Sequence, residues 1–447
     1  MTEPRTAIPW WPTLTKLTAP AMHSRLRRPG TAGFSLIEIL ISMVLALITF
    51  LVMFQMFDNW DKTKRSTASG SGAMVTGALA MFRLERDLRL AGFGFGNASE
   101  LGCTVTAYDS TRPNEAAAGA VSATASGVFT FPLVALQVVD GASGASDQVV
   151  ALYGSSEGIS TTRFFGTSAA GAQPYTGAAA TSTSMEIGAR GGILGGDLVV
   201  LAQASGSCNL VEVTDTSFGD RRTFAYNTAV SYCNSYIDAN TCAQASAPTS
   251  SHYNVPSGVT VSGATGNVYV LGPRPQRRIW QIRNNRTLAY VNDLGSGTGI
   301  AAAALTDTHG EFVDVADNIV NLQAQYGVAT VAGSAATAVC TPVTNPTWTT
   351  TAPVTACQPF LWAVRVALLA RSDQFEKGWG VPASSGAAIA PSWIGGSFTM
   401  TNIDGTADSY TSSTLTAPSK NPNDWRHYRY RVFESTIPLK NIMWASR

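Results

Sequence analysis

The sequence is poor in charge and lacks an excess of either sign. Asp, Glu, Lys and Arg make up 13% of the 447 residues, and 30 basic residues against 29 acidic ones give a formal net charge of +1. Domains that bind nucleic acid usually carry a basic excess on one face. The near-neutral balance therefore argues against nucleic acid, and we expect no such partner.

The sequence also lacks the motifs of common catalytic and metal centres. No H-E-x-x-H, Walker A, G-x-G-x-x-G or C-x-x-C pattern occurs. Gly154-Ser-Ser-Glu-Gly158 matches G-x-S-x-G, but an extended stretch follows it instead of the helix that a nucleophilic Ser156 requires. A calcium site at Asp404 and Asp408 is an alternative, although it lacks the ligand ladder of an EF-hand. We expect no enzyme activity, cofactor or metal.

Cysteine is scarce, but its distribution is informative. The 6 cysteines all lie beyond residue 57, at Cys103, Cys208, Cys233, Cys242, Cys340 and Cys357. An even number on one side of a hydrophobic segment is typical of disulfides formed in an oxidising compartment. Spacing favours Cys233 with Cys242 and Cys340 with Cys357, which leaves Cys103 for Cys208. The sequence alone does not fix the pairing, and free buried cysteines are the alternative.

One long hydrophobic run lies near the N-terminus. Between Phe34 and Phe57 the only charged residue is Glu38, and the run has the roughly 20 apolar residues that a membrane-spanning helix needs. Three arginines just before it place that end in the cytoplasm and the following chain outside. The Ala32-Gly33 pair precedes the run, whereas an ordinary secretory cleavage site follows the apolar region. An ionisable residue inside such a span indicates a paired, functional site.

The start of this run resembles the signal of type IV prepilins. The family pattern is glycine, an aromatic residue, Ser/Thr-Leu-Ile/Val-Glu and an apolar helix, and it is matched by Gly33, Phe34, Ser35, Leu36, Ile37 and Glu38. The resemblance implies that a prepilin peptidase cleaves after Gly33 and methylates the amine of Phe34. It also implies that Glu38 pairs with the N-terminus of a neighbouring subunit, which offsets the cost of the buried charge. A plain signal anchor with an incidental glutamate is the alternative.

The resemblance divides the chain into four parts. They are a basic leader at 1–33 that is removed, a membrane and assembly segment at 34–57, an exported helical segment at 58–92 and a β-rich domain at 93–447. Met22 is an alternative start that would shorten the leader.

The exported helical segment has an interruption and then a regular pattern. Residues 66–72, rich in serine and glycine, predict a weak stretch of helix. Beyond it we expect one apolar face to pack on a sheet, formed by Val75, Ala78, Leu79 and Phe82. The spacing also predicts ion pairs of Arg83 with Asp87 and of Glu85 with Arg89. Gly92 is a natural helix stop.

The remaining chain is dominated by β-strand patterns. Apolar or alternating runs occur at 128–139, 148–152, 197–202, 210–213, 268–271, 364–369 and 428–433, and a hairpin is predicted to turn near Asn284. Stretches rich in Ala, Gly, Ser and Thr at 115–127, 166–184 and 328–338 predict long surface loops. The predicted fold class is α+β: a long N-terminal helix packed on an antiparallel β-sheet, pilin-like, and enlarged by β-rich and loop insertions.

Five later segments are similar to minor pilins of the PilW type. They follow the family's order at 86–94, 195–200, 315–327, 362–371 and 430–441. This resemblance implies a minor pilin that takes part in priming pilus assembly, and so in adhesion or twitching motility. It implies the prepilin peptidase, other minor pilins, the major pilin, the inner-membrane assembly platform and a tip adhesin as partners. The implied location is the inner membrane, as a single-pass protein with a periplasmic domain, and then the pilus at the cell surface.

Two other functions remain open. A type II secretion pseudopilin would use the same N-terminal signal for protein export. A membrane-anchored adhesin or periplasmic enzyme would carry the signal by coincidence.

Overall fold

The computed structural model describes residues 33, 35–96, 100–109, 128–141, 144–156, 162–166, 181–204, 206–216, 222–226, 253–255, 258–261, 265–284, 286–294, 312–332, 339–341, 346–375, 390–406 and 421–445. The chain divides into two compact units, Met1–Lys62 and Thr63–Arg447. Of the three predicted surface loops, 115–127 lies outside the described residues, as do 167–180 and 333–338 of the other two. The described ends of these two contain the short strands β6 (Thr181–Ser182) and β17 (Thr330–Ala332), so the loop prediction was wrong there.

The first helix, α1, runs without a break from Leu36 to Leu90. Its part Leu36–Lys64 contains an 18-residue stretch with a mean hydropathy of 2.7 and is long and apolar enough to cross a membrane. Residues 66–72, predicted to be weak, are helical in the structure because helical turns on both sides supply the nucleus that a short helix lacks. A lower local stability there stays a prediction. The helix ends before Gly92, whose φ of +78° is the left-handed conformation of a helix C-terminus.

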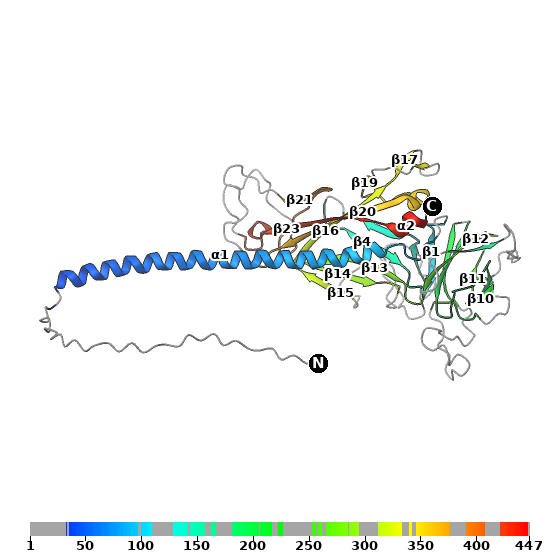
Figure 1. Cartoon of the computed structure of the whole chain (residues 1–447), viewed down its shortest axis with the longest axis horizontal. Coiled ribbons are helices and arrows are strands. Elements are labelled where there is room, and N and C mark those ends of the chain that lie inside the picture. Colours follow the sequence, from blue (N-terminus) through cyan, green and yellow to red (C-terminus); the bar gives the residue numbers. More distant parts are fainter. Residues whose placement is uncertain are drawn as a thin grey trace, which may run out of the picture. The chain divides into compact units, whose positions relative to one another are not determined.

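Most strands form three sheets (Figure 1). The six-stranded sheet has the order β2 (Val128–Pro132), β1 (Thr104–Tyr108), β9 (Ser207–Glu212), β8 (Leu198–Gln203), β12 (Thr265–Gly272) and β5 (Arg163–Gly166). The five-stranded sheet has the order β15 (Val313–Asp317), β14 (Thr287–Asn292), β13 (Gln276–Arg283), β4 (Gln148–Tyr153) and β3 (Leu136–Val139). The four-stranded sheet has the order β19 (Thr347–Thr349), β16 (Ile319–Val328), β20 (Leu361–Arg371) and β23 (Tyr430–Pro438).

Short elements complete the second unit. Two-stranded pairs are formed by β7 (Ser184–Glu186) with β10 (Thr223–Ala225), β6 (Thr181–Ser182) with β11 (Val259–Thr260), β17 (Thr330–Ala332) with β18 (Val339–Thr341), and β21 (Ser392–Trp393) with β22 (Gly396–Ser397). The short helices are η1 (Thr355–Phe360), η2 (Trp425–His427) and α2 (Lys440–Ala445). Among the described strands, β1 and β9 pair in parallel and the other pairs are antiparallel. The α+β prediction is confirmed, although several sheets replace the single one expected.

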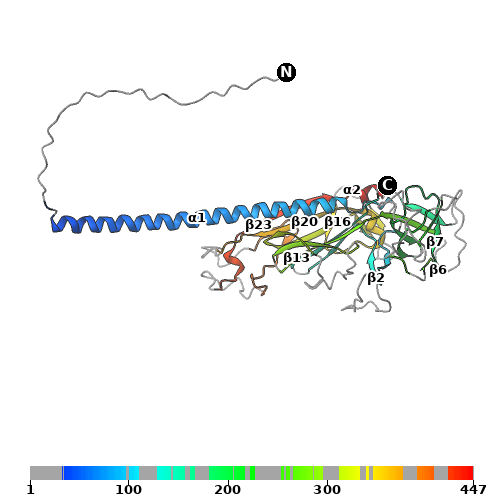
Figure 2. The same ribbon diagram turned by 90° about the horizontal axis from the view of Figure 1, so that it is seen from below.

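The main apolar core joins the second half of α1 to the sheets. Ala80, Leu84 and Leu88 of α1 lie in one buried cluster with Leu322 of β16 and Val366 of β20. Figures 1 and 2 both show this half of the helix beside β16, β20 and β23. The second half of the helix therefore lies along the four-stranded sheet.

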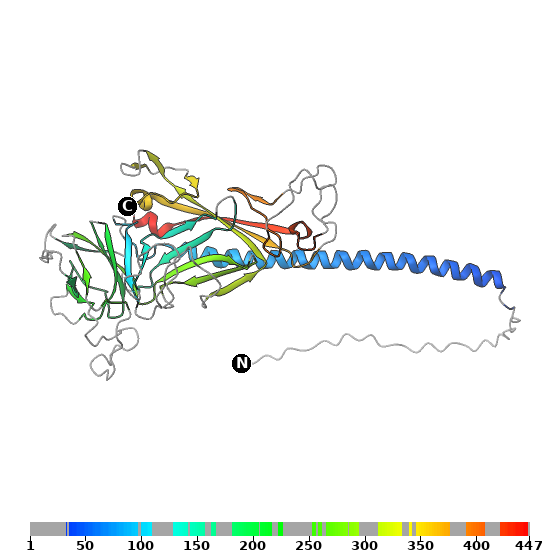
Figure 3. The same ribbon diagram turned by 180° about the vertical axis from the view of Figure 1, so that it is seen from behind.

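The six-stranded sheet is buried on both faces. Side chains alternate along β8, so Val200 faces the main core whereas Val199 and Leu201 face a second core. That second core is completed by Met185 of β7 and Phe224 of β10. Figure 3 shows these strands at the end of the second unit where the C-terminus also lies. This β-rich addition enlarges the domain beyond the helix and its sheet.

Candidate assembly surface

The predicted processing site lies at the start of α1. Gly33 is exposed, and Phe34 lies outside the described residues. The carbonyl oxygen of Ser35 accepts hydrogen bonds from the backbone N–H of Glu38 at 2.9 Å and of Ile39 at 3.2 Å. Glu38 is exposed in the first helical turn, where the helix dipole favours a carboxylate.

The face of α1 that packs on the sheets is not the one that the apolar spacing predicted. Val75, Leu79 and Phe82 are 69%, 48% and 62% exposed. The buried face instead consists mainly of small and aliphatic residues, namely Ala73, Gly77, Ala80, Met81, Leu84 and Leu88. The prediction was wrong because the helix has two apolar faces, and the spacing does not say which one meets the sheet.

Gly77 explains why small residues occupy the buried face. A Cβ at this position would overlap the ring of Phe433, which projects from β23. The absent side chain lets the strand and its aromatic ring approach the helix closely. Glycine at this position lowers the helix propensity, but it permits close contact with the four-stranded sheet.

A buried ion pair fixes the same face to the five-stranded sheet. Asp87, with a side chain 1% exposed, accepts two hydrogen bonds from Nη1 of Arg278 at 2.8 and 3.0 Å. The guanidinium of Arg278 also lies 4.6 Å from the centre of the Tyr290 ring. The predicted pair of Arg83 with Asp87 is therefore replaced by a contact from helix to sheet. Burial, with a further contribution from Asp87, raises the pKa of the Tyr153 phenol beside it.

The second predicted ion pair is confirmed and extended. Glu85 and Arg89 lie 3.5 Å apart on the helix, and Oγ of Ser435 in β23 donates a hydrogen bond to Glu85. At the end of α1, Asn441 of α2 donates to the carbonyl oxygens of Leu90 and Ala91, both at 3.2 Å. These contacts satisfy carbonyl groups that a helix end leaves open.

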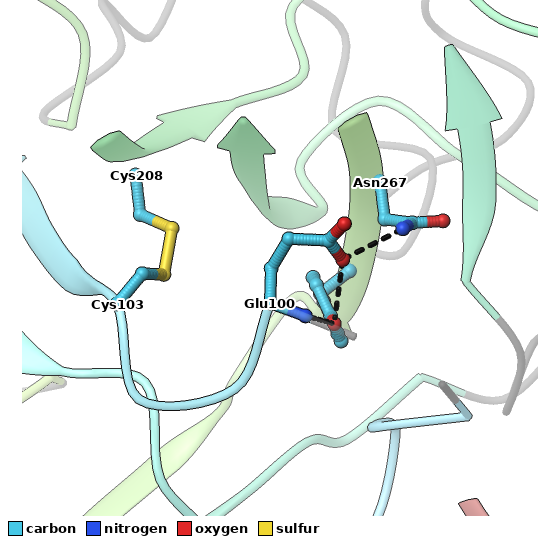
Figure 4. The surroundings of a disulfide bond; sticks show 5 residues. Glu100, Cys103, Cys208 and Asn267 are labelled. Atoms are coloured by element: carbon cyan, nitrogen blue, oxygen red, sulfur yellow. Dashed lines mark hydrogen bonds between the residues drawn. A yellow bond between two sulfur atoms is a disulfide. The ribbon is translucent and has the colours of Figure 1, made fainter. Parts of the chain in front are cut away.

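Two disulfides are formed within the described part of the chain. Cys103, before β1, is bonded to Cys208 in β9, with 6.1 Å between the Cα atoms. Beside it, Glu100 accepts a hydrogen bond from Asn267 of β12 at 2.6 Å (Figure 4). Cys340 of β18 is bonded to Cys357 of η1. The second pairing is one that the spacing favoured, and the first is the one that remained for Cys103 and Cys208.

Of the remaining candidate residues from the sequence, the structure describes Ser156 and Asp404. Cys233, Cys242 and Asp408 lie outside the described residues. Ser156 is buried after β4, and the carboxylate of Asp404 accepts hydrogen bonds from Thr406 and Asn423. Within the described ranges, no group of three or more His, Cys, Asp or Glu is placed to hold a metal ion.

The fold and these contacts define an α+β protein with an apolar N-terminal helix that fits a membrane anchor. The family model described as Type IV Pilus-assembly protein W matches residues 298–441, and this supports a PilW-type protein with a role in type IV pilus assembly. The matched region contains β16, β20 and β23, the strands beside α1. No curated protein and no solved structure matches the chain.

Proposed function

We propose that the protein is a minor pilin that takes part in priming type IV pilus assembly, and so in pilus-dependent adhesion or twitching motility. The family match supports the role in assembly. The observation that carries the finer role is α1, which combines a membrane-length apolar part with a second part that is apolar on its exposed face.

The exposed stripe of Val75, Leu79 and Phe82 supports an assembling function. These residues follow the spacing i, i+4 and i+7, so they line one side of the helix. The opposite side already packs in the main core. Complete burial of such a side chain contributes roughly 1.5–3 kcal/mol, and these side chains, which are 48–69% exposed, lack part of that contribution. A helix with both faces apolar is suited to pack on its own sheet and on neighbouring helices.

The chemistry at the start of the helix gives the proposed mechanism. Cleavage after Gly33 by the prepilin peptidase creates a new amine at Phe34, and methylation keeps its positive charge. In an assembly of parallel helices, this amine pairs with Glu38 of a neighbouring subunit and offsets the cost of burying a carboxylate among apolar groups. Registration between subunits then follows from this ion pair.

The proposal also implies a location and a set of partners for the protein. The domain beyond the span faces the periplasm before assembly and is displayed on the pilus afterwards. Its partners are the inner-membrane assembly platform, other minor pilins, the major pilin and a tip adhesin. The role is structural, without catalysis.

Replacement of Glu38 tests this mechanism. We expect Glu38→Ala to leave leader cleavage intact, because the cleavage site precedes it, and to reduce the number of surface pili strongly. Asp58→Ala is the matched control, since Asp58 is an exposed acid of the same helix paired with Lys62. Pili would be counted by electron microscopy of sheared and whole-cell samples. Normal piliation of the Glu38→Ala strain would contradict the proposal.

Deletion of the chain separates the pilus from a secretion system. Loss of pili with normal protein secretion is expected. Loss of secretion with normal twitching motility would instead assign the protein to a type II secretion pseudopilus.

A further inference from the structure

Two stretches of α1 carry the same pattern of apolar residues. The domain stripe is defined as Val75, Leu79, Phe82 and Arg86, and the membrane stripe as Phe50, Phe54, Phe57 and Asp61. In both stripes the residues follow the spacing i, i+4, i+7 and i+11, which places them on one side of a helix. The rings of Phe50 and Phe54 lie 5.5 Å apart, as expected for neighbours on one helix face.

The apolar residues of both stripes are left uncovered by the chain itself. In the membrane stripe, Phe50, Phe54 and Phe57 are 64%, 66% and 64% exposed. The three apolar residues of the domain stripe are 48–69% exposed. A bilayer covers the membrane stripe until assembly draws the helix out, and in an exported filament the cover for either stripe has to come from another subunit.

The charges at the ends of the two stripes are opposite in sign. Asp61 ends the membrane stripe and Arg86 ends the domain stripe, and both side chains are exposed. A shift of 25 residues, from position 50 to position 75, therefore superimposes apolar on apolar residues and acid on base.

We infer that the domain stripe of one copy binds the membrane stripe of a second copy of this chain, in parallel and with a stagger of 25 residues. The contact covers three phenylalanines that leave the bilayer and places Asp61 beside Arg86. A copy packed in register would instead place Arg86 beside Arg86 and Asp61 beside Asp61, and like charges in such a contact are unfavourable. The inference rests on the proposed function, because only assembly moves one helix along another.

Disulfide trapping in the full-length chain tests the register. Phe57→Cys and Phe82→Cys would be expressed together, one in each copy, in cells that make pili. In sheared pili treated with a mild oxidant, we expect a dimer of this chain on a non-reducing gel. Phe82→Cys expressed alone is the control for a contact in register, and the parent chain gives the background from the native cysteines.

Exchanging the charges at positions 61 and 86 tests whether they determine this register. Arg86→Asp is expected to lower the yield of the trapped dimer about tenfold, because it brings two acids together. Adding Asp61→Arg to the same chain restores the opposite charges and is expected to restore the dimer. Arg83→Asp is the matched control, because Arg83 lies beside the stripe and not within it.

The possible results separate the inference from the proposed function. Absence of the parent chain from sheared pili would overturn both. Its presence without the staggered dimer would overturn the inference alone. So would a dimer from Phe82→Cys by itself, a link to a different subunit in place of a second copy, or failure of the double charge exchange to restore the yield.

Discussion

The two faces of the second half of α1 are built from different side chains. The buried face carries Gly77, Ala80 and the paired Asp87, whereas the exposed face carries Leu79 and Phe82. Small residues stand inside because β23 and its Phe433 ring lie close to the helix. Leu79 and Phe82 are left exposed by the chain, whereas Leu84 and Leu88 are buried on the other face. At the contact with β23, side-chain size in addition to apolar spacing distinguishes the buried face from the exposed face, which is the one proposed to assemble.

The largest effect on the free energy of unfolding should come from removing the Asp87 carboxylate on the buried face. Asp87→Ala leaves Arg278 without its carboxylate, and loss of one partner of a buried ion pair costs about 3–5 kcal/mol of unfolding free energy. Urea unfolding of the full chain in detergent would measure the loss. Arg83→Ala, on the exposed face, is the control and should change stability by less than about 0.5 kcal/mol. An equal loss of stability in the two variants would contradict the claim that only the buried face stabilises the fold.

Gly77 tests close approach on the buried face. Gly77→Ala should destabilise the protein by about 1–3 kcal/mol, because its methyl group overlaps the Phe433 ring. Gly72 is a matched control on the same helix, since a Cβ there meets no atom within 4 Å. Gly72→Ala should therefore stabilise by about 0.5–1 kcal/mol through helix propensity. Stabilisation by both substitutions, seen in the same unfolding assay, would mean that β23 does not press on the helix.

Asp147 can be compared with Asp87. Both are buried acids, but Asp147 accepts hydrogen bonds from backbone N–H groups, whereas Asp87 is paired with an arginine. Its carboxylate accepts hydrogen bonds from the N–H groups of Gly141 at 2.9 Å and Ala324 at 2.7 Å. Burial outweighs these donors and raises the pKa of Asp147 from 3.8 to about 6. Because the folded-state pKa is the higher one, its contribution to stability is full below about pH 3.8 and is lost as pH rises through 6.

The corresponding variant removes this pH dependence. Relative to the native chain, Asp147→Asn should gain on the order of 2 kcal/mol between about pH 4 and pH 7. Thermal unfolding of both proteins across that range would show it. Parallel stability curves would show that Asp147 keeps an ordinary pKa in the folded protein.

The smallest effect on stability should come from the exposed face. The double variant Leu79→Ser and Phe82→Ser removes apolar groups that the chain leaves exposed, so it should unfold within about 0.5 kcal/mol of the native protein. Its amount in sheared pili, measured by immunoblot, should nevertheless fall several-fold. Normal incorporation would show that this stripe has no role in assembly.

Several elements of the fold follow from local patterns. The runs at 148–152 and 197–202 become β4 and β8, and the hairpin turns at Asn284, whose φ is +50°. The long N-terminal helix and its end before Gly92 also follow from the local sequence. These features depend on residues close in sequence, which is why the sequence predicts them.

Other elements depend on contacts between distant segments. The strand β16 is absent from the predicted set, although Asn321, Gln323 and Gln325 alternate along it with apolar residues, a pattern that indicates a strand with one polar face. In the structure Asn321 is 3% exposed and its amide donates to the carbonyl oxygen of Gly144 at 3.0 Å. The single run expected at 128–139 likewise divides into β2 and β3, which enter different sheets. Asp87 likewise pairs with Arg278, which is 191 residues away in the sequence, and not with the predicted helix neighbour Arg83.

The N-terminal peptide of the chain in sheared pili tests the central claim most directly. Mass spectrometry should find a methylated amine on Phe34, with residues 1–33 removed, and this product should disappear in cells that lack the prepilin peptidase. An intact leader, or cleavage after the apolar span, would contradict the account, because no charged amine would then be available for Glu38.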